Sequence, residues 1–281
     1  MTAQPTEQPK KASKAGRNLP AAITVGVTLG AVLVVGLFYL PAVLVLLAAA
    51  AVAVGTWEVC HGLNQKRGMG VPLIPAVATA FFMPFAAYYG GGQWLIFTVV
   101  ASILVLIGWR IVGKRDGMIM SIMGSIFVMS WVPFMISLAL LLYREESGAG
   151  KVLMILLMAI GNDTWGYIAG VLWGKHPMAP KISPKKTWEG FAGSMVGSLI
   201  VGIICSMVIG DPWWYGIIVA IFLVIASTVG DLGESMVKRE IGIKDMSNLL
   251  PGHGGVMDRL DSIVFAIATG YVIFAVLGAI F

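Results

Sequence analysis

Residues 93–112 read QWLIFTVVASILVLIGWRIV, and this stretch indicates the class of fold. It contains one charged side chain, Arg110, and matches the roughly 20 apolar residues that a helix needs to cross a bilayer. Similar apolar runs recur from Leu19 to the end of the chain. Only 12% of the residues are charged, whereas a soluble domain has about 25%. The sequence therefore predicts an all-α integral membrane protein.

The apolar runs predict nine transmembrane helices, over residues 19–38, 41–57, 71–89, 93–112, 118–142, 152–173, 190–210, 213–230 and 260–281. Glycine and proline between neighbouring runs predict tight turns, so that neighbouring helices are antiparallel. Residues 1–18 are polar and basic, and we expect them to form a disordered cytoplasmic tail. Residues 19–281 are expected to form one membrane domain.

Lysine and arginine are unevenly distributed along this topology. With a cytoplasmic N-terminus, 17 of the 19 lie in cytoplasmic segments, and only Arg144 and Lys151 lie on the other side. Such a bias follows the positive-inside rule. It predicts a multi-pass plasma-membrane protein whose C-terminus is outside. Topology and anionic lipid explain the net charge of +5, and no nucleic-acid partner is expected.

Acidic residues gather where the last spans end and begin. Asp231 and Glu234 close one span, and Asp258 and Asp261 open the last one. Each pair has a spacing of three residues, which places both members on one helix face if the helix continues. Helix capping would explain one aspartate but not two. Mg²⁺ prefers carboxylate oxygens together with substrate phosphates, so Asp231 and Asp258 are the predicted ligands, with Glu234 and Asp261 beside them.

Asp163 lies inside a predicted span, where an ionisable side chain is costly. Its position indicates either a functional role or a hydrogen bond with Asn162 or Thr164. A functional Asp163 would join the same group of carboxylates, as a second ligand or in the outer shell.

Two segments on the predicted cytoplasmic side are typical of phosphate binding. In PGHGG (251–255), the glycines around His253 let the backbone approach a ligand, and free amides near a helix start can bind phosphate. In SPKKT (183–187), two lysines and two hydroxyls can hold a phosphate or a headgroup. The alternative for this segment is a lysine pair that sets topology, followed by Thr187 as a helix cap.

The stretch SMVKREIGIKDMSNLLPGHGGVMDRLD (235–261) resembles the signature of phosphatidate cytidylyltransferases. The matching positions are Ser235, Lys238, Arg239, Lys244, Asp245, Ser247, Pro251, His253, Gly254, Gly255, Asp258, Arg259 and Asp261. The segments SPKKTWEG (183–190) and GNDTWGY (161–167) are also similar to that family. The motifs cover about residues 150–261, and the active site is expected within 160–261. The N-terminal half resembles the family only in span count and hydropathy.

The resemblance implies a reaction that transfers CMP from CTP to phosphatidic acid, giving CDP-diacylglycerol and pyrophosphate in phospholipid biosynthesis. It also implies Mg²⁺, K⁺ as a second cation, membrane lipids as partners, a homodimer and an active site that faces the cytoplasm.

With the residues and the resemblance together, the predicted catalytic residues are Asp231, Asp258, Lys238, Arg239 and His253. The predicted metal ligands are Asp231, Asp258, Asp261 and Glu234. The predicted substrate-binding residues are Asn162, Asp163, Ser183, Lys185, Lys186, Thr187, Lys244, Gly254, Gly255 and Arg259.

Other classes of function share some of these features. A cation-coupled transporter also carries intramembrane carboxylates and interrupted helices, but here the polar residues cluster at one face and not at the midplane. A CDP-alcohol phosphatidyltransferase resembles DGxxAR, whereas Asp116-Gly117 is followed here by Met-Ile-Met-Ser. A non-catalytic scaffold does not explain the clustered carboxylates.

Overall fold

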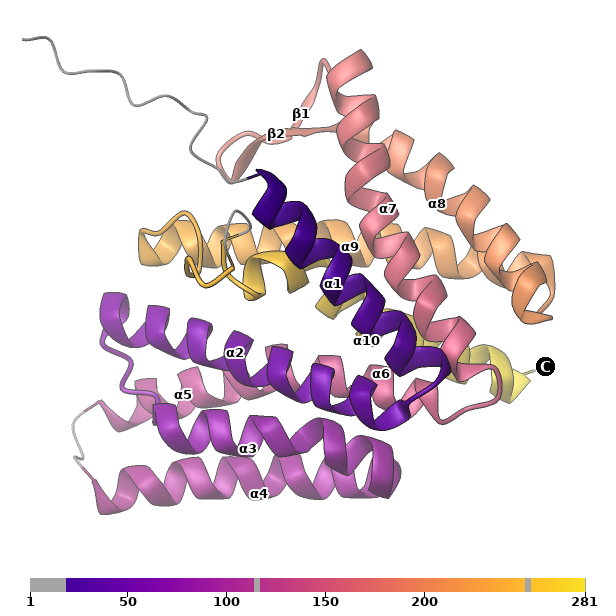
Figure 1. Ribbon diagram of the computed structural model, residues 1–281. Helices are drawn as coiled ribbons and strands as arrows, with labels where there is room; N and C mark the ends of the chain where they lie inside the picture. The colour runs from indigo at the N-terminus through magenta and orange to yellow at the C-terminus, as the bar shows by residue number, and fades with distance from the viewer. Residues whose placement is uncertain (1–18, 114–116, 251–253, 281) are drawn as a thin grey trace, which may run out of the picture.

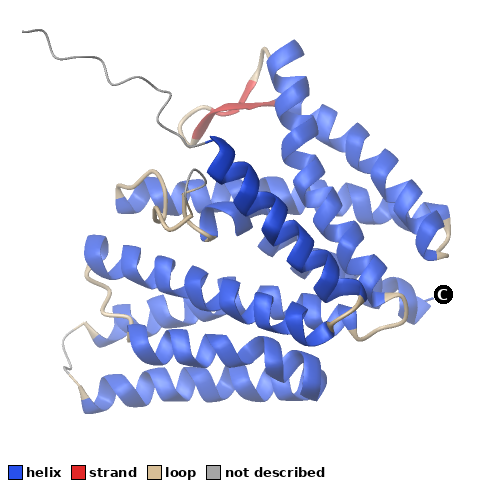
Figure 2. Ribbon diagram, in the orientation of Figure 1, coloured by secondary structure: helices blue, strands red, loops and turns tan. Residues whose placement is uncertain are grey.

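The computed structural model describes residues 19–113, 117–250 and 254–280, so the predicted tail (1–18) lies outside the described residues. The described chain is almost entirely helical (Figures 1 and 2). In chain order the elements are α1 (Leu19–Phe38), α2 (Pro41–Arg67), α3 (Leu73–Phe85), the π-helical turn η1 (Ala86–Gly90), α4 (Gly91–Val112), α5 (Met118–Met129), the π-helical turn η2 (Ser130–Phe134), α6 (Met135–Tyr143), α7 (Gly148–Trp173), β1 (Pro177–Ala179), β2 (Ser183–Thr187), α8 (Trp188–Ile209), α9 (Trp213–Ile241) and α10 (Met257–Ile280).

The helices form two groups that α10 joins. Helices α2 to α6 stack together at the bottom of Figure 1, and α7, α8 and α9 pack against one another above them. Helix α10 contacts α7 and α9 of the upper group and α2 and α6 of the lower group. The last helix therefore links the part of the chain that carries the sequence motifs to the part that does not.

Seven helical segments of the described chain are long and apolar enough to cross a membrane. Many large apolar side chains on them remain exposed, including Ile96, Phe97, Val171 and Leu172. Apolar surface on this scale is rare in soluble proteins and is typical of contact with lipid. The prediction of a helical membrane protein is therefore confirmed.

The number of spans differs from a simple reading of the apolar runs. One of the seven segments, Leu73–Val112, includes α3, η1 and α4, and the chain reverses at Gly91, whose φ is 77°. As a result α3 and α4 pack side by side (Figure 1). Helix α1 has 20 residues and is not one of these seven segments. The nine spans and the orientation of the termini stay predictions.

Three helices extend beyond the predicted apolar runs. Helix α2 continues to Arg67, α9 continues to Ile241, and α10 begins at Met257. These extensions are polar, and hydropathy alone does not detect them. They place Asp231, Glu234 and Lys238 on one continuous helix.

A small hairpin departs from the all-α expectation. Strands β1 and β2 pair antiparallel between α7 and α8, with Pro177 opposite Thr187 and Ala179 opposite Ser183. Pairing satisfies backbone N–H and C=O groups that a short polar connection would otherwise leave to water. The hairpin also fixes where Lys185 and Lys186 lie.

Candidate active site

Several of the predicted polar residues gather between the C-terminal half of α7, the hairpin, the start of α8 and the middle of α9. A cavity of about 290 Å³ lies between these segments. Six of the predicted residues line it: Asn162, Asp163, Lys185, Lys186, Thr187 and Asp231. Its wall therefore combines two cations with two carboxylates.

Lys186 of the hairpin forms an ion pair with Asp231 of α9. Each of the two side chains is 24% exposed, so the pair is only partly screened by solvent. The pair joins two segments that are far apart in the sequence. A lysine held at a cavity wall in this way can exchange its carboxylate partner for a phosphate oxygen.

Asp163 connects α7 to α10. The hydroxyl of Ser262 donates a hydrogen bond to Asp163 Oδ2 over 3.3 Å, and Asn162 Nδ2 donates to Asp163 Oδ1 over 3.3 Å. Ser194 of α8 donates to the carbonyl oxygen of Asn162 over 2.5 Å. Asp163 therefore makes an interhelical hydrogen bond and also lines the cavity, so the two interpretations of this residue are compatible.

Four carboxylates lie within electrostatic range of one another at or near the cavity. Asp261 interacts electrostatically with Asp231 and Asp163, and Glu234 interacts with Asp261. Helices α9 and α10 approach closely at this level because Gly230 has no side chain: a Cβ there would lie 2.6 Å from the carbonyl oxygen of Asp261. Carboxylates in such proximity repel one another unless cations offset their charge.

The chemistry of these donors fits Mg²⁺. Carboxylate oxygens are its preferred protein ligands, and it usually takes one or two of them together with substrate phosphates. Buried Glu234 Oε2 has no hydrogen-bond partner among the described residues. Across residues 19–113, 117–250 and 254–280, however, no group of three or more His, Cys, Asp and Glu side chains is arranged to hold a metal ion. The metal ligands stay predictions.

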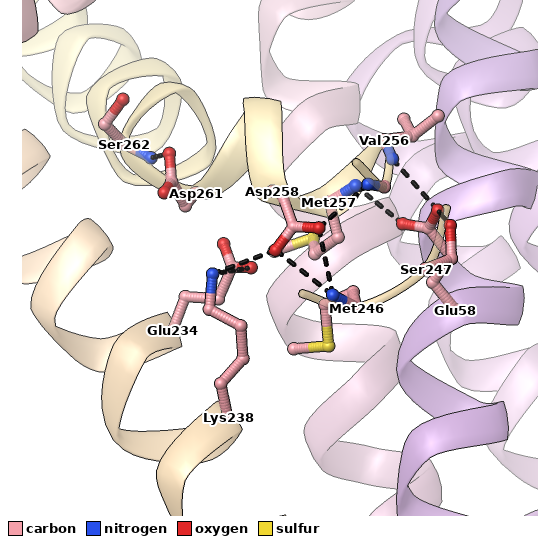
Figure 3. A network of polar contacts seen from close by, with 11 residues as sticks. Glu58, Glu234, Lys238, Met246, Ser247, Val256, Met257, Asp258, Asp261 and Ser262 are labelled. Atoms are coloured by element: carbon pink, nitrogen blue, oxygen red, sulfur yellow. Dashed lines mark hydrogen bonds and ion pairs between the residues drawn. The ribbon is translucent and has the colours of Figure 1, made fainter. Parts of the chain in front are cut away.

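Lys238 lies at the centre of a second, buried network (Figure 3). Its Nζ is 2.9 Å from Asp258 Oδ1 and 3.1 Å from Glu234 Oε1. The three side chains are 14%, 6% and 0% exposed, respectively. The cation therefore offsets two carboxylates that solvent cannot stabilise.

Asp258 also organises the segment that precedes α10. The amide of Gly255 donates to Asp258 Oδ2 over 2.8 Å, and the amide of Met246 donates to the same oxygen over 2.9 Å (Figure 3). With Lys238 on Oδ1, both carboxylate oxygens of Asp258 already have donors. The structure thus presents Asp258 as a residue that shapes the loop, and a metal would have to displace at least one of these donors.

Glu58 of α2 is a site residue that sequence reasoning missed. It is 1% exposed and accepts hydrogen bonds from Ser247, Val256 and Met257 (Figure 3). The predicted span ended at residue 57, one position before it. An acidic residue next to an apolar run was the available signal, because an ionisable group in a span indicates function.

Thr187 serves as the N-cap of α8. Its hydroxyl oxygen accepts a hydrogen bond from the amide of Gly190 over 3.1 Å. The capping interpretation of this residue is therefore confirmed, and its hydroxyl still lines the cavity. Nearby, Glu189 accepts hydrogen bonds from the amides of Lys175 and His176, which closes the hairpin against the start of α8.

The other predicted residues are less closely associated with the cavity. Ser183 lies in β2, and Arg239, Lys244 and Arg259 are exposed around the ends of α9 and α10. The amide of Gly254 donates to the carbonyl of Leu250. His253 lies outside the described residues. The substrate-binding roles of these positions stay predictions.

The fold and the site define a class: a polytopic helical membrane protein with lysines and carboxylates around a cavity. Comparison with known proteins identifies the family within this class. Residues 20–277 match the model of the cytidylyltransferase family, and the chain belongs to that family. The protein is therefore an enzyme, a nucleotidyltransferase.

Several relatives are similar over most of their length. The chain is 38% identical to the phosphatidate cytidylyltransferase of Mycobacterium leprae (strain TN), covering 91% of this chain and 87% of the relative. It is 36% identical to the phosphatidate cytidylyltransferase of Mycobacterium tuberculosis (strain ATCC 25618 / H37Rv), covering 98% and 91%. It is 32% identical to that of Staphylococcus saprophyticus subsp. saprophyticus, covering 73% and 80%. The similarity therefore includes the N-terminal half.

Proposed function

We propose that this enzyme transfers CMP from CTP to phosphatidic acid in phospholipid biosynthesis. A phosphate oxygen of phosphatidic acid attacks the α-phosphorus of CTP, the bond from that phosphorus to the bridging oxygen breaks, and pyrophosphate leaves with the oxygen. The products are CDP-diacylglycerol and pyrophosphate. The observation that carries this proposal is the cavity that Lys185, Lys186, Asp163 and Asp231 line between membrane-length helices.

Both substrates are polyanions, so the site has to offset their mutual repulsion before the phosphates can meet. Lys186 and Lys185 provide positive charge at the cavity wall. Lys238 offsets the charge of Glu234 and Asp258 in the neighbouring network. Positioning and charge stabilisation supply most of the rate enhancement in phosphoryl-type transfer. The attacking phosphate is already ionised, so no strong general base is required.

Mg²⁺ is the proposed cofactor, and K⁺ is a proposed second cation. Asp231, Asp261 and Asp163 would hold the metal, with Glu234 beside them, and a bound Mg²⁺ would neutralise developing charge on the phosphates. Asp258 remains the alternative ligand if its present donors move. Asp163 and Asp231 line the same cavity, which supports this assignment.

We further propose that the active site faces the cytoplasm, at the plasma membrane, in a homodimer. The excess of lysine and arginine in the segments around the cavity supports the orientation. A site at the membrane surface lets a water-soluble nucleotide and a lipid headgroup meet while the acyl chains remain in the bilayer.

The proposal is tested with the full-length chain in detergent, phosphatidic acid, Mg²⁺ and CTP labelled on either the α- or the γ-phosphate. We expect the α-label to enter the lipid and the γ-label to appear in pyrophosphate. Asp231→Asn should lower turnover about a hundredfold or more, because a preorganised charge is lost. Glu146→Gln, an exposed acidic residue in the connection between α6 and α7, is the matched control and should retain turnover.

Lipid labelled from the γ-phosphate, or no labelled lipid from folded wild-type protein, would contradict the proposed reaction. Full turnover by Asp231→Asn would leave the reaction in place and contradict the assignment of its site.

A further inference from the structure

Helix α2 packs along the segment that joins α9 to α10. Gly62 faces Ile241, since a Cβ there would lie 3.1 Å from the Cδ1 of that residue. Gly55 lies opposite Met257, and Arg67 pairs with Glu240 over 3.3 Å. Contacts at successive levels therefore dock the C-terminal part of α2 against the ends of α9 and α10, which carry the signature residues.

Glu58 makes the polar contact at the middle of this surface (Figure 3). Its Oε1 accepts from the hydroxyl of Ser247 over 2.5 Å and from the amide of Val256 over 2.9 Å. Its Oε2 accepts from the amide of Met257 over 2.7 Å. These donors lie 189 to 199 positions further along the chain.

The surroundings of Glu58 explain how it is tolerated at 1% exposure. A buried carboxylate is costly unless hydrogen bonds satisfy it. Val256 directly precedes α10 and Met257 is its first residue, where the helix dipole favours negative charge. Glu58 thus caps α10 from a different helix, and its charge-assisted hydrogen bonds are stronger than neutral ones.

Glu58 and Asp258 both accept hydrogen bonds from the backbone of residues 255–257. A Cβ on Gly255 would lie 2.8 Å from Glu58 Oε1 and 2.9 Å from Asp258 Oδ2. The amide of Gly255 binds Asp258, and the next two amides bind Glu58. The direction in which α10 leaves this segment decides where Asp261 lies relative to Asp231.

We infer that Glu58 is a positioning residue for the transfer reaction: it fixes Ser247, Val256 and Met257, and the direction in which α10 starts then sets the positions of Asp258 and Asp261. This inference rests on the proposed function. The inference also assigns a role to the N-terminal half. Helix α2 supplies the carboxylate that accepts hydrogen bonds from Ser247, Val256 and Met257.

The test compares wild type, Glu58→Gln and Val45→Ala, all full length in detergent. Val45 is a fully buried residue near the other end of α2, so its variant controls for a general loss of stability. Gln retains the size of Glu but replaces one acceptor oxygen with a donor. Hydrogen exchange of the amides at 255–257 and of α8 is measured together with thermal stability, kcat and the KM for CTP.

For Glu58→Gln we expect faster exchange at 255–257 with unchanged exchange in α8. We also expect kcat to fall about tenfold to a hundredfold, because small misplacements of reacting groups are costly. The KM for CTP should change less than kcat. Val45→Ala should lose comparable thermal stability and keep its turnover.

Unchanged exchange at 255–257 would overturn the inference, and so would a loss of kcat no larger than that of Val45→Ala at equal stability. If Glu58→Gln does not fold, the same measurements are made on Ser247→Ala, which removes one of the three hydrogen bonds that Glu58 accepts. Wild-type exchange and turnover in Ser247→Ala would then overturn the inference. A wild-type protein that forms no CDP-diacylglycerol would contradict the proposed function, whereas the exchange measurement would still test the role of Glu58.

Discussion

Lys238 illustrates how single residues hold this site together. Its ammonium group lies between Glu234 and Asp258, and all three side chains are largely withdrawn from solvent. Burying charges is costly, and the cost is recovered only while each charge keeps its partners. The network as a whole therefore contributes little to the stability of the fold. Loss of one member, however, leaves a buried charge unpaired and destabilises the protein.

Replacement of Lys238 by methionine should destabilise the protein by about 3–5 kcal/mol, because two buried carboxylates lose their cation. Denaturant unfolding in detergent measures this loss. The added change Glu234→Gln should recover part of it by removing one of the unpaired charges. Lys66→Met, at an exposed lysine of α2, should have little effect. A double variant that is less stable than Lys238→Met alone would contradict this view of the network.

Lys186→Gln should lower kcat/KM for CTP about tenfold to a hundredfold, since a contact with a charged group contributes about 1.5–3 kcal/mol. The matched control is Lys181→Gln, an exposed lysine in the turn of the same hairpin. Steady-state kinetics with varied CTP measures both variants. Equal effects of the two changes would show that general positive charge, rather than the position of Lys186, matters.

At the scale of elements, glycine decides how closely helices approach. On α9, Gly230 faces the backbone of α10, and a Cβ added there would lie only 2.6 Å from the carbonyl oxygen of Asp261. A Cβ added at Gly233 would meet no atom within 4 Å. The two glycines are about one helical turn apart on the same helix and differ in what they face. Gly233 is therefore a control for the effect of close helix packing at Gly230.

Gly230→Ala should destabilise the protein by about 1–3 kcal/mol through overpacking. It should also reduce turnover, because α10 carries Asp258 and Asp261. Gly233→Ala should be neutral or stabilising by about 0.5–1 kcal/mol, since glycine is unfavourable inside a helix. Thermal unfolding and turnover of both variants measure this. Equal behaviour of the two would show that α9 and α10 are not in close contact at Gly230.

At the scale of the whole molecule, the hairpin and the connection between α6 and α7 lie at opposite ends of α7 (Figure 1). With 26 residues, α7 is long enough to span the bilayer. The two connections should therefore be on opposite sides of the membrane. The positive-inside rule predicts that the hairpin side is cytoplasmic.

Cysteines introduced as Lys181→Cys and Glu146→Cys, in a chain with Cys60 and Cys205 replaced by serine, should report this orientation. A membrane-impermeant maleimide added to intact cells should label position 146 and not position 181. Position 181 should become labelled after the cells are permeabilised. Labelling of both positions in intact cells would contradict the predicted topology.

Sequence reasoning predicted the membrane class and most of the helices, because the length and polarity of a run are local properties. It also placed Asp231 and Glu234 on one helix if the apolar run continued, and α9 contains both. Lys186 was predicted to bind substrate, and that role stays a prediction. It did not predict the hairpin or the polar ends of α2, α9 and α10, which depend on contacts between segments.

The sequence by itself therefore determined an apolar helical protein with its charged residues concentrated in the C-terminal half. Only the tertiary structure decided which of these charges meet: Lys186 with Asp231, Lys238 with Asp258, and Glu58 with the start of α10. The physical reason is that hydropathy is set by consecutive residues, whereas a buried charge is stabilised by partners that folding brings from distant positions. Glu58 and Met257 are 199 positions apart, so no local pattern connects them.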